Sequence, residues 1–284
     1  MANNHALDRG AVGLENTIKN VDASGLVGFG ARLVTHAVAT STVAALAAST
    51  STTSTSTSAI LNYKITEKNG IRIGFLSYTY GTNGLSLPKS KSGMLSYINK
   101  DQISKDIKDL KKQNVDAVVV AMHFGVEYKL DENANQRDLA QFTCDSGADI
   151  VLGDHPHVLE PITYLNDKKC LVIYSLGNFI SAMPNLYMDL GGILKVEITK
   201  NEGGDIGIGN ASSSTSSISM KPDFIATWVK RGTGFDGRRY YTVLPLDADN
   251  IGGDIKITAS EAKRIELYKD YVNTKIKVGI VDFK

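Results

Sequence analysis

The sequence predicts an α/β protein in which two β-sheets form the core and helices lie outside them. Short apolar runs, typical of buried strands, alternate with segments whose apolar residues recur at helical spacing. Long stretches typical of strands and hairpins follow in the second half of the chain. With 284 residues, of which 42% are hydrophobic, the chain is long enough to bury a sizeable core. We treat residues 1–284 as one domain.

Helical periodicity appears twice in the first half of the chain. Residues 101–113 place Ile103, Ile107 and Leu110 on one face and charged residues on the other. In residues 135–147, helical spacing places Leu139 and Phe142 on the inward face. Gly147 ends this stretch, and glycine is typical of a helix C-terminus. Each helix is followed by an apolar run, which is the alternation expected of a layered α/β core. The buried strands expected there are 115–122, 148–153 and 169–179.

The remaining segments complete the expected element order. Residues 191–200 and 224–246 read as extended strands and hairpins, and residues 260–272 as a closing helix. Two segments lack the large apolar side chains that offset the entropy of ordering. The first, 37–58, is almost entirely Ala, Ser and Thr, and we expect a low-complexity insertion there. The second, 203–222, is expected to form a flexible surface loop.

Bulk composition excludes several classes of protein. A formal net charge of +1 gives no indication of a nucleic-acid partner. Cys144 and Cys170 form no CxxC motif, and we expect two buried free thiols, with one disulfide as the alternative. No apolar stretch is long enough to span a membrane, and no signal peptide is visible. If Met1 is the true start, the chain is expected in the cytoplasm.

Histidines stand at the ends of two of the expected strands. His123 follows one apolar run, and His155 and His157 follow the next, with Pro156 stiffening the backbone between them. Ligands bind at the carboxyl edge of open α/β sheets, and imidazoles there commonly hold zinc, manganese or iron. We therefore expect these three side chains to converge on a metal or phosphate site. The alternative is that they are polar loop residues that cap strands.

Four further polar residues are candidates for the same site. Asp154 reads as a ligand, as a partner that orients an imidazole, or as a solvated loop acid. Glu127 reads as a site residue or as half of a surface ion pair. Asn178 follows a third strand and Gly177, and reads as a site residue or as part of an ordinary turn. Asp8 lies in the opening loop.

Five segments, in order, resemble the bacterial CapA/PgsA-type family of capsule or poly-γ-glutamate biosynthesis proteins. The resemblance extends from Ala2 to about Lys200, and this family is similar to the calcineurin-like metallophosphoesterases. It therefore implies a metallophosphoesterase-like sandwich of two sheets. The five segments are "ANNHALDRG", "NGIRIGFLSYTYGTNG", "VVVAMHFGVEY", "GADIVLGDHPHVLEPI" and "YSLGNFI".

The resemblance also implies roles for single residues. Asn4 matches a metal-ligating asparagine, and His5 matches a histidine that protonates or positions a phosphoryl oxygen. His123, His155 and His157 match metal-ligating histidines. Since chain termini fray, the placement of Asn4 and His5 at the site rests on the resemblance alone.

The chain departs from the family pattern at its start. Two acidic metal motifs of the family precede the Asn-His loop, and neither is present, so the chain reads as an N-terminally incomplete member that lacks its first strand or strands. The resemblance implies a capsule or poly-γ-glutamate biosynthesis or export protein, catalytically impaired, in a polymer-synthesis complex at the membrane of the cell envelope. The divalent metal (Mn, Zn or Fe) is expected to bind weakly. The alternatives are an active metal-dependent phosphoesterase and a non-catalytic remnant.

Overall fold

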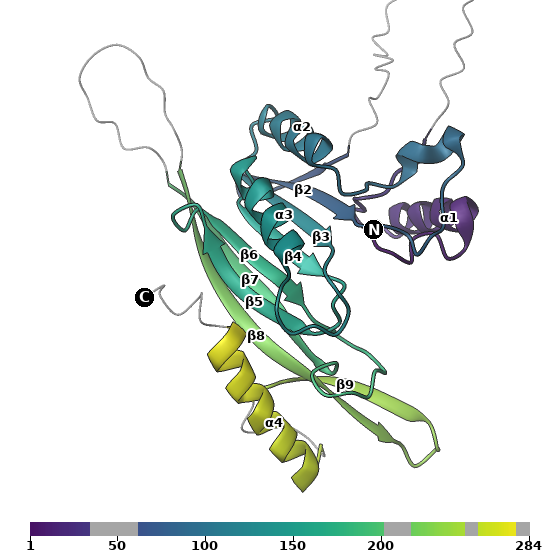
Figure 1. Ribbon diagram of the computed structural model, residues 1–284, viewed down its shortest axis with the longest axis vertical. Coiled ribbons are helices and arrows are strands. Elements are labelled where there is room, and N and C mark those ends of the chain that lie inside the picture. The colour runs from purple at the N-terminus through teal and green to yellow at the C-terminus, as the bar shows by residue number, and fades with distance from the viewer. Residues whose placement is uncertain (35–61, 202–216, 248–254, 277–284) are drawn as a thin grey trace, which may run out of the picture.

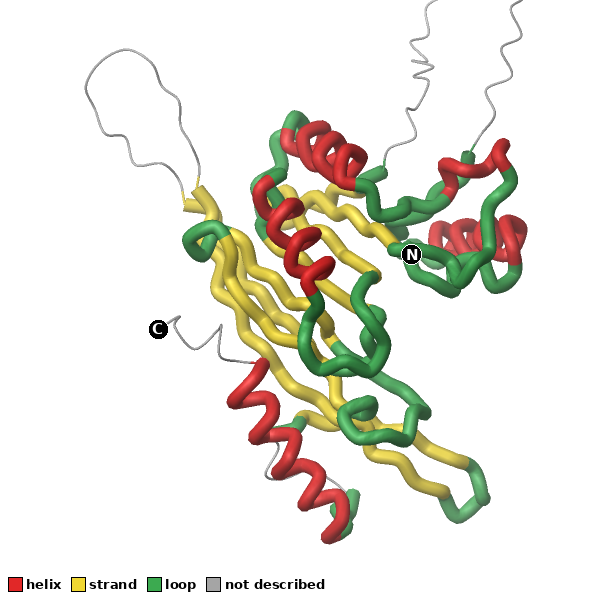
Figure 2. The backbone as a smooth tube through the Cα atoms, in the orientation of Figure 1, coloured by secondary structure: helices red, strands yellow, loops and turns green. Residues whose placement is uncertain are grey.

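The computed structural model describes residues 1–34, 62–201, 217–247 and 255–276. Its core consists of two β-sheets with helices on the outside (Figures 1 and 2), so the predicted α/β fold of two sheets flanked by helices is confirmed. The low-complexity segment 37–58 and residues 203–216 of the expected loop lie outside the described residues. Among the described helices, none is long and apolar enough to cross a membrane.

The main sheet has six strands in the order β1-β2-β3-β4-β6-β5. The four strands β2, β3, β4 and β6 are parallel, whereas β1 and β5 pair antiparallel at the two edges. The carboxyl ends of the parallel strands therefore lie at one edge of the sheet. The strands are β1 (Lys64–Lys68), β2 (Ile71–Thr79), β3 (Ala117–His123), β4 (Ile150–Asp154), β5 (Leu159–Leu165) and β6 (Cys170–Leu176).

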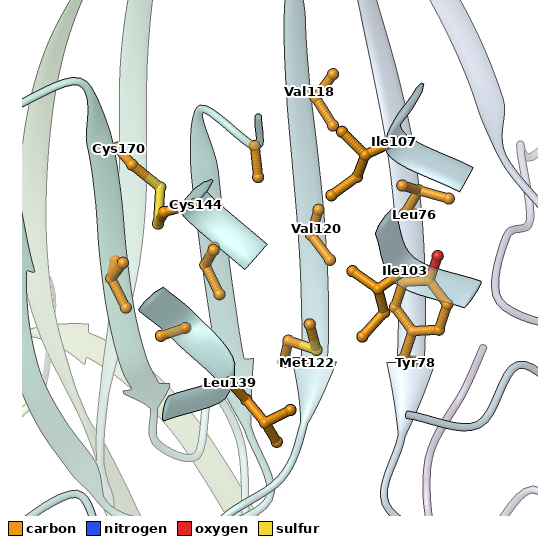
Figure 3. Packing of buried hydrophobic residues seen from close by; sticks show 14 of the residues in the cluster. Leu76, Tyr78, Ile103, Ile107, Val118, Val120, Met122, Leu139, Cys144 and Cys170 are labelled. Atoms are coloured by element: carbon orange, nitrogen blue, oxygen red, sulfur yellow. A yellow bond between two sulfur atoms is a disulfide. The ribbon is translucent and has the colours of Figure 1, made fainter. Parts of the chain in front are cut away.

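Strand β3 shows why this sheet forms from apolar runs. Its side chains alternate between two buried layers, because both faces of the sheet are covered. Val118 and Val120 pack under the helices α2 (Lys100–Lys111) and α3 (Ala134–Asp145), as Figure 3 shows, and Val119 packs in the opposite layer. Both helices begin at asparagine caps.

The second sheet is antiparallel and contains β7 (Leu190–Asn201), β8 (Ser217–Thr233) and β9 (Arg239–Pro245). Strand β8 pairs with β7 along its first twelve residues and with β9 only from Thr227 onward. Pro222 lies in the part of β8 that pairs with β7 alone, and proline is found mainly in edge strands of this kind. The prediction of a loop over 203–222 is wrong for residues 217–222, because they pair with β7.

The opening of the chain is packed, contrary to the expectation that it frays. Ala2 and Leu7 are buried with Leu14 and Ile18 of α1 (Gly10–Ala23), a helix that the sequence analysis did not predict. These apolar contacts hold the first residues against the body of the protein. The closing helix is confirmed as α4 (Ala259–Tyr271), which continues into a short helical segment, Val272–Ile276.

The two cysteines form a disulfide, so the prediction of free thiols is wrong. Cys144 lies in the last turn of α3 and Cys170 begins β6, and their Cα atoms lie 5.8 Å apart in the core beneath the helices (Figure 3). Their sequence separation of 26 residues gave no sign of this contact. The pairing follows from how α3 packs on the sheet, which spacing alone does not reveal.

Candidate functional site

The candidate site lies at the carboxyl edge of the parallel strands. Thr79, the last residue of β2, is opposite His123, the last residue of β3. His123 is in turn opposite Asp154, the last residue of β4. The loop that follows β4 carries His155 and His157. Three adjacent strands therefore deliver polar side chains to one place, which is the usual ligand position in sheets of this kind.

The three histidines form a chain of neighbouring rings. The ring centroids of His123 and His155 are 4.8 Å apart, and those of His155 and His157 are 6.3 Å apart. His123 and His155 are each only 9% exposed. The sheet edge thus gathers imidazoles that come from two different strand ends.

Two imidazole nitrogens of this cluster have no hydrogen-bond partner among the described residues. They are the buried Nδ1 atoms of His123 and His155. His123 Nδ1 lies 3.1 Å from a carboxylate oxygen of Asp154, but the contact does not have hydrogen-bond geometry. Burial, followed by the nearby His123 ring, lowers the pKa of His155. A buried, neutral imidazole with an unpaired nitrogen is suited to bind a transition-metal ion.

Asn4 joins this cluster from the opening loop of the chain. It is only 5% exposed, and its Oδ1 lies 2.9 Å from His123 Nε2. The Asn4 Nδ2 donates to Asn83 Oδ1 at 3.2 Å, which turns the amide oxygen toward the histidine. The structure therefore brings Asn4 next to His123, although the two residues are 119 positions apart in the sequence.

The loop between β4 and β5 has an unusual backbone. His155 and His157 have φ angles of 105° and 61°, in the left-handed region that side chains other than glycine rarely adopt. The carbonyl of Pro156 between them accepts a hydrogen bond of 2.8 Å from Tyr128 N, so the loop after β3 braces it. Strained backbone of this kind clusters at functional sites, because only a demanding side-chain arrangement justifies its cost of about 1–3 kcal/mol.

Asn178 is connected to this strained loop. Its Oδ1 lies 3.0 Å from His157 Nδ1, and its Nδ2 donates to the carbonyl of His157 at 3.2 Å. The same Nδ2 donates to the carbonyl of Met188 at 2.9 Å. Asn178 therefore ties the β4–β5 loop to the segment that leads into β7.

The other candidates lie farther out. The side chain of His5 is 62% exposed, and its ring pairs with Asp8 at 3.0 Å on the surface. Glu127 hydrogen bonds with the Tyr128 hydroxyl and thereby raises the pKa of that phenol. The side chain of Asp154 is 56% exposed, and it forms an ion-pair contact with the His123 ring.

Two tyrosines that the sequence analysis did not single out border the cluster. The Tyr80 ring centroid is 4.8 Å from that of His155 and 6.2 Å from that of His123. On the other side, the Tyr128 ring stacks on His157 at 5.9 Å. Tyr80 follows β2 directly, so recognising that strand as a neighbour of β3 would have placed this ring at the same edge.

The donor atoms present fit a divalent metal as a partial set. Unpaired imidazole nitrogens and an oriented amide oxygen are suitable ligands. However, among the described residues no group of three His, Cys, Asp or Glu side chains is arranged to hold one ion.

Comparisons of sequence identify similar proteins. Residues 1–183 match the family model described as bacterial capsule synthesis protein PGA_cap. The chain is 34% identical over 184 residues to the capsule biosynthesis protein CapA of Bacillus anthracis, covering 63% of this chain and 39% of that protein. It is 33% identical over 214 residues to the PGA biosynthesis protein CapA of Bacillus subtilis (strain 168), covering 70% of this chain and 48% of that protein.

Solved structures give only distant similarities. The calcineurin-like phosphoesterase YfkN from Bacillus subtilis matches with a TM-score of 0.27 and 15% identity, over 75% of this chain and 59% of that one. A 5′-nucleotidase precursor from Thermus thermophilus matches with a TM-score of 0.30 and 12% identity, over 74% of this chain and 33% of that one. At these scores the similarities carry no argument about function.

Proposed function

Because the chain belongs to the family of bacterial capsule synthesis proteins, we propose that it takes part in the biosynthesis or export of a capsule polymer of the poly-γ-glutamate type. The observation that carries this proposal is the family match over residues 1–183. The two curated relatives are named for capsule and PGA biosynthesis. The chain spans less than half of their length, at 39% and 48%, so the activity and partners of those whole proteins are part of the proposal.

We place this activity at the cell envelope, in a complex that synthesises the polymer at the membrane. The names of the relatives support this location. The buried disulfide between Cys144 and Cys170 also supports it, because disulfides persist mainly in oxidising surroundings outside the cytosol.

The proposed site binds a divalent metal ion, Mn, Zn or Fe, through Asn4, His123, His155 and His157. The buried Nδ1 atoms of His123 and His155, which have no hydrogen-bond partner among the described residues, support this assignment. When bound, such an ion polarises a phosphoryl oxygen as a Lewis acid. His5 would protonate or position that oxygen, and the contact of its Nδ1 with the Asp8 carboxylate at 3.0 Å orients its ring.

We propose that this site is catalytically impaired within the present chain. Two-metal hydrolysis needs bridging carboxylates, and Asp154 is the one carboxylate that forms an ion pair with the histidine cluster among the described residues. The absence of a three-residue ligand group in that part of the chain agrees with weak binding. An efficient metal-dependent phosphoesterase is therefore the second candidate.

Titration calorimetry with Mn²⁺ and Zn²⁺ tests the site. We expect weak, saturable binding by the purified chain, and none by the double variant His155→Ala with His157→Ala. His5→Ala is the matched control and should keep the affinity, because His5 is assigned to the phosphoryl group. Unchanged binding by the double variant would refute the site. Rapid hydrolysis of bis(p-nitrophenyl) phosphate that the double variant abolishes would favour the second candidate.

A separate experiment tests the role in capsule formation. The chain is expressed in a bacterium whose own capsule synthesis relative has been deleted, and cell-bound polymer is measured. We expect the amount of polymer to differ from that of the empty-vector strain. Equal amounts at equal expression would contradict a role of this chain in capsule formation.

A further inference from the structure

A cavity of about 400 Å³ lies between the β8–β9 hairpin and the segment that joins β6 to β7. We propose that this cavity, called the arginine cavity below, binds the oxyanion group of a ligand, either a carboxylate or a phosphate. Its volume lies within the range typical of small-molecule sites. The lining residues are Ala182, Pro184, Arg231, Gly232, Thr233, Arg239, Tyr240 and Tyr241.

Arg231 is held in place by the protein itself, before any ligand arrives. Its guanidinium donates to the buried carboxylate of Asp189 at 3.0 Å. The same carboxylate accepts from Arg264 at 2.8 Å and from the Tyr268 hydroxyl. The Asp189 carboxylate therefore lies between the guanidinium groups of Arg231 and Arg264. These three side chains together keep a net positive charge. A fixed guanidinium loses little entropy when it binds an anion.

Arg239 adds a further positive charge to the cavity. Among the described residues, its side chain forms no ion pair, whereas the preceding residue, Arg238, lies 3.7 Å from Asp236. Arg239 pairs with Thr233 across the hairpin, so it lines the same cavity as Arg231. No acidic residue is among the described residues that line the cavity, so their side chains make it electropositive.

The walls of the cavity are also suited to a ligand. Arg231 is paired with Tyr241 in the ladder and Thr233 with Arg239, so these side chains lie on one face of the hairpin. Tyr240, Tyr241 and Pro184 give the cavity flat, partly apolar walls, and Thr233 offers a hydroxyl. Small-molecule sites are usually lined by apolar and aromatic side chains together with a small number of charged or polar groups.

The arginine cavity is distinct from the histidine cluster, and the inference does not depend on metal binding. The segment 178–188 contacts both, because Asn178 hydrogen bonds with His157 while Ala182 and Pro184 line the cavity. A planar guanidinium binds carboxylate or phosphate through two parallel N–H groups, so arginine geometry fits both ligand classes.

The test compares two neighbouring arginines of the hairpin. Glutarate and methyl phosphate are titrated in separate experiments into the wild-type chain, Arg239→Gln and Arg238→Gln, with binding followed by calorimetry and by NMR shifts. We expect saturable binding of one or both anions, a loss of at least about tenfold in Arg239→Gln, and a change below about twofold in Arg238→Gln. The Arg238 side chain is 88% exposed and does not line the cavity, so it is a matched control.

The two titrations identify the class of anion, because a carboxylate site binds glutarate more tightly and a phosphate site binds methyl phosphate more tightly. Equal losses in the two variants would overturn the proposal, since they would indicate only a general attraction to a basic hairpin. Absence of saturable binding by either anion to wild-type protein would also overturn it. Circular dichroism of each variant establishes that the fold is retained.

Discussion

His157 and Asn178 contact each other at two points. The imidazole Nδ1 of His157 lies 3.0 Å from the amide oxygen of Asn178, and the amide nitrogen returns a hydrogen bond of 3.2 Å to the His157 carbonyl. A residue with φ of 61° is thus held through its ring and its backbone by one side chain. This pair fixes the orientation of the outermost ring in the histidine cluster.

Replacing Asn178 should therefore loosen the β4–β5 loop. Asn178→Ala removes the contacts to His157 and leaves the carbonyl of Met188 without its donor, which should lower the free energy of unfolding by about 1–3 kcal/mol. Asn178→Asp keeps an acceptor for the His157 ring but loses the hydrogen bonds that Nδ2 donates to the carbonyls of His157 and Met188 and to the sulfur of Met183. Urea unfolding measures stability, and NMR of the imidazoles measures ring order. An alanine variant as stable and as ordered as wild type would contradict this account.

Gly153 should tolerate no side chain. It lies on β4 beside β6, and an added Cβ would lie 1.9 Å from the carbonyl oxygen of Tyr174 and 2.8 Å from that of Ile173. Since the obstacles are backbone atoms of the central sheet, Gly153→Ala should abolish folding or lower stability by several kcal/mol. Gly81→Ala is the control, because nothing lies within 4 Å of its added Cβ. Comparable thermal stability of the two variants would show that the sheet is less rigid than described.

Glu160 should make stability depend on pH. It is fully buried, one oxygen accepts a hydrogen bond of 2.6 Å from Gln136, and the other has no hydrogen bond among the described residues. Burial, with contributions from Glu132 and Asp131, raises its pKa to about 7 from an ordinary value of 4.5. Because the folded state then binds the proton more tightly, the free energy of unfolding should fall as pH rises from 4.5 to about 7.

The variant Glu160→Gln measures this contribution. Its side chain stays neutral, so its stability relative to wild type should increase across that pH window, by roughly 3 kcal/mol at most. Urea unfolding at about pH 5 and about pH 8, on either side of the raised pKa, gives the two differences. Glu266→Gln, at an exposed position, is the control and should show no such trend. A constant difference between Glu160→Gln and wild type would mean that Glu160 is ionised throughout.

The disulfide should contribute substantially to stability. Cys144 and Cys170 close a loop with a sequence separation of 26 residues, for which chain entropy predicts a contribution of roughly 3 kcal/mol. Reduction of the wild-type chain should therefore lower the urea midpoint, and the double variant Cys144→Ala with Cys170→Ala should be destabilised. The same reductant should leave the double variant unaffected. An unchanged midpoint in reduced wild type would contradict a formed disulfide.

The parts of the fold that local pattern decides were predictable from the sequence. The apolar run of β3 and the helical spacing of Ile103, Ile107 and Leu110 identify buried elements, because burial on two faces or on one leaves a direct trace in composition. Helix α1 was missed because only Leu14 and Ile18 are buried within it. The disulfide was missed because it depends on the packing of α3 against β6.

The candidate site was predictable only in part. The position of histidines after strand ends indicated one edge of the sheet, and the register of β2, β3 and β4 determines what meets there. The ring of Tyr80 beside His123 and His155 was missed because β2 was not recognised as a strand. The stacking of Tyr128 on His157 depends on a backbone φ of 67° at Tyr128, which the sequence pattern does not indicate. Nor could it show that His5 pairs with Asp8 on the surface.

Strand β8 has a mechanical consequence for the molecule. It runs without interruption over 17 residues, roughly 55 Å, and Thr227 and Trp228 pair with β7 on one side and β9 on the other. A continuous strand contains no loop at which the hairpin could bend away from the second sheet, so we expect the hairpin with Arg239 to move together with that sheet. The segment 178–188 contacts both the histidine cluster and the arginine cavity, so we expect a shift of the hairpin to reach His157 through Asn178.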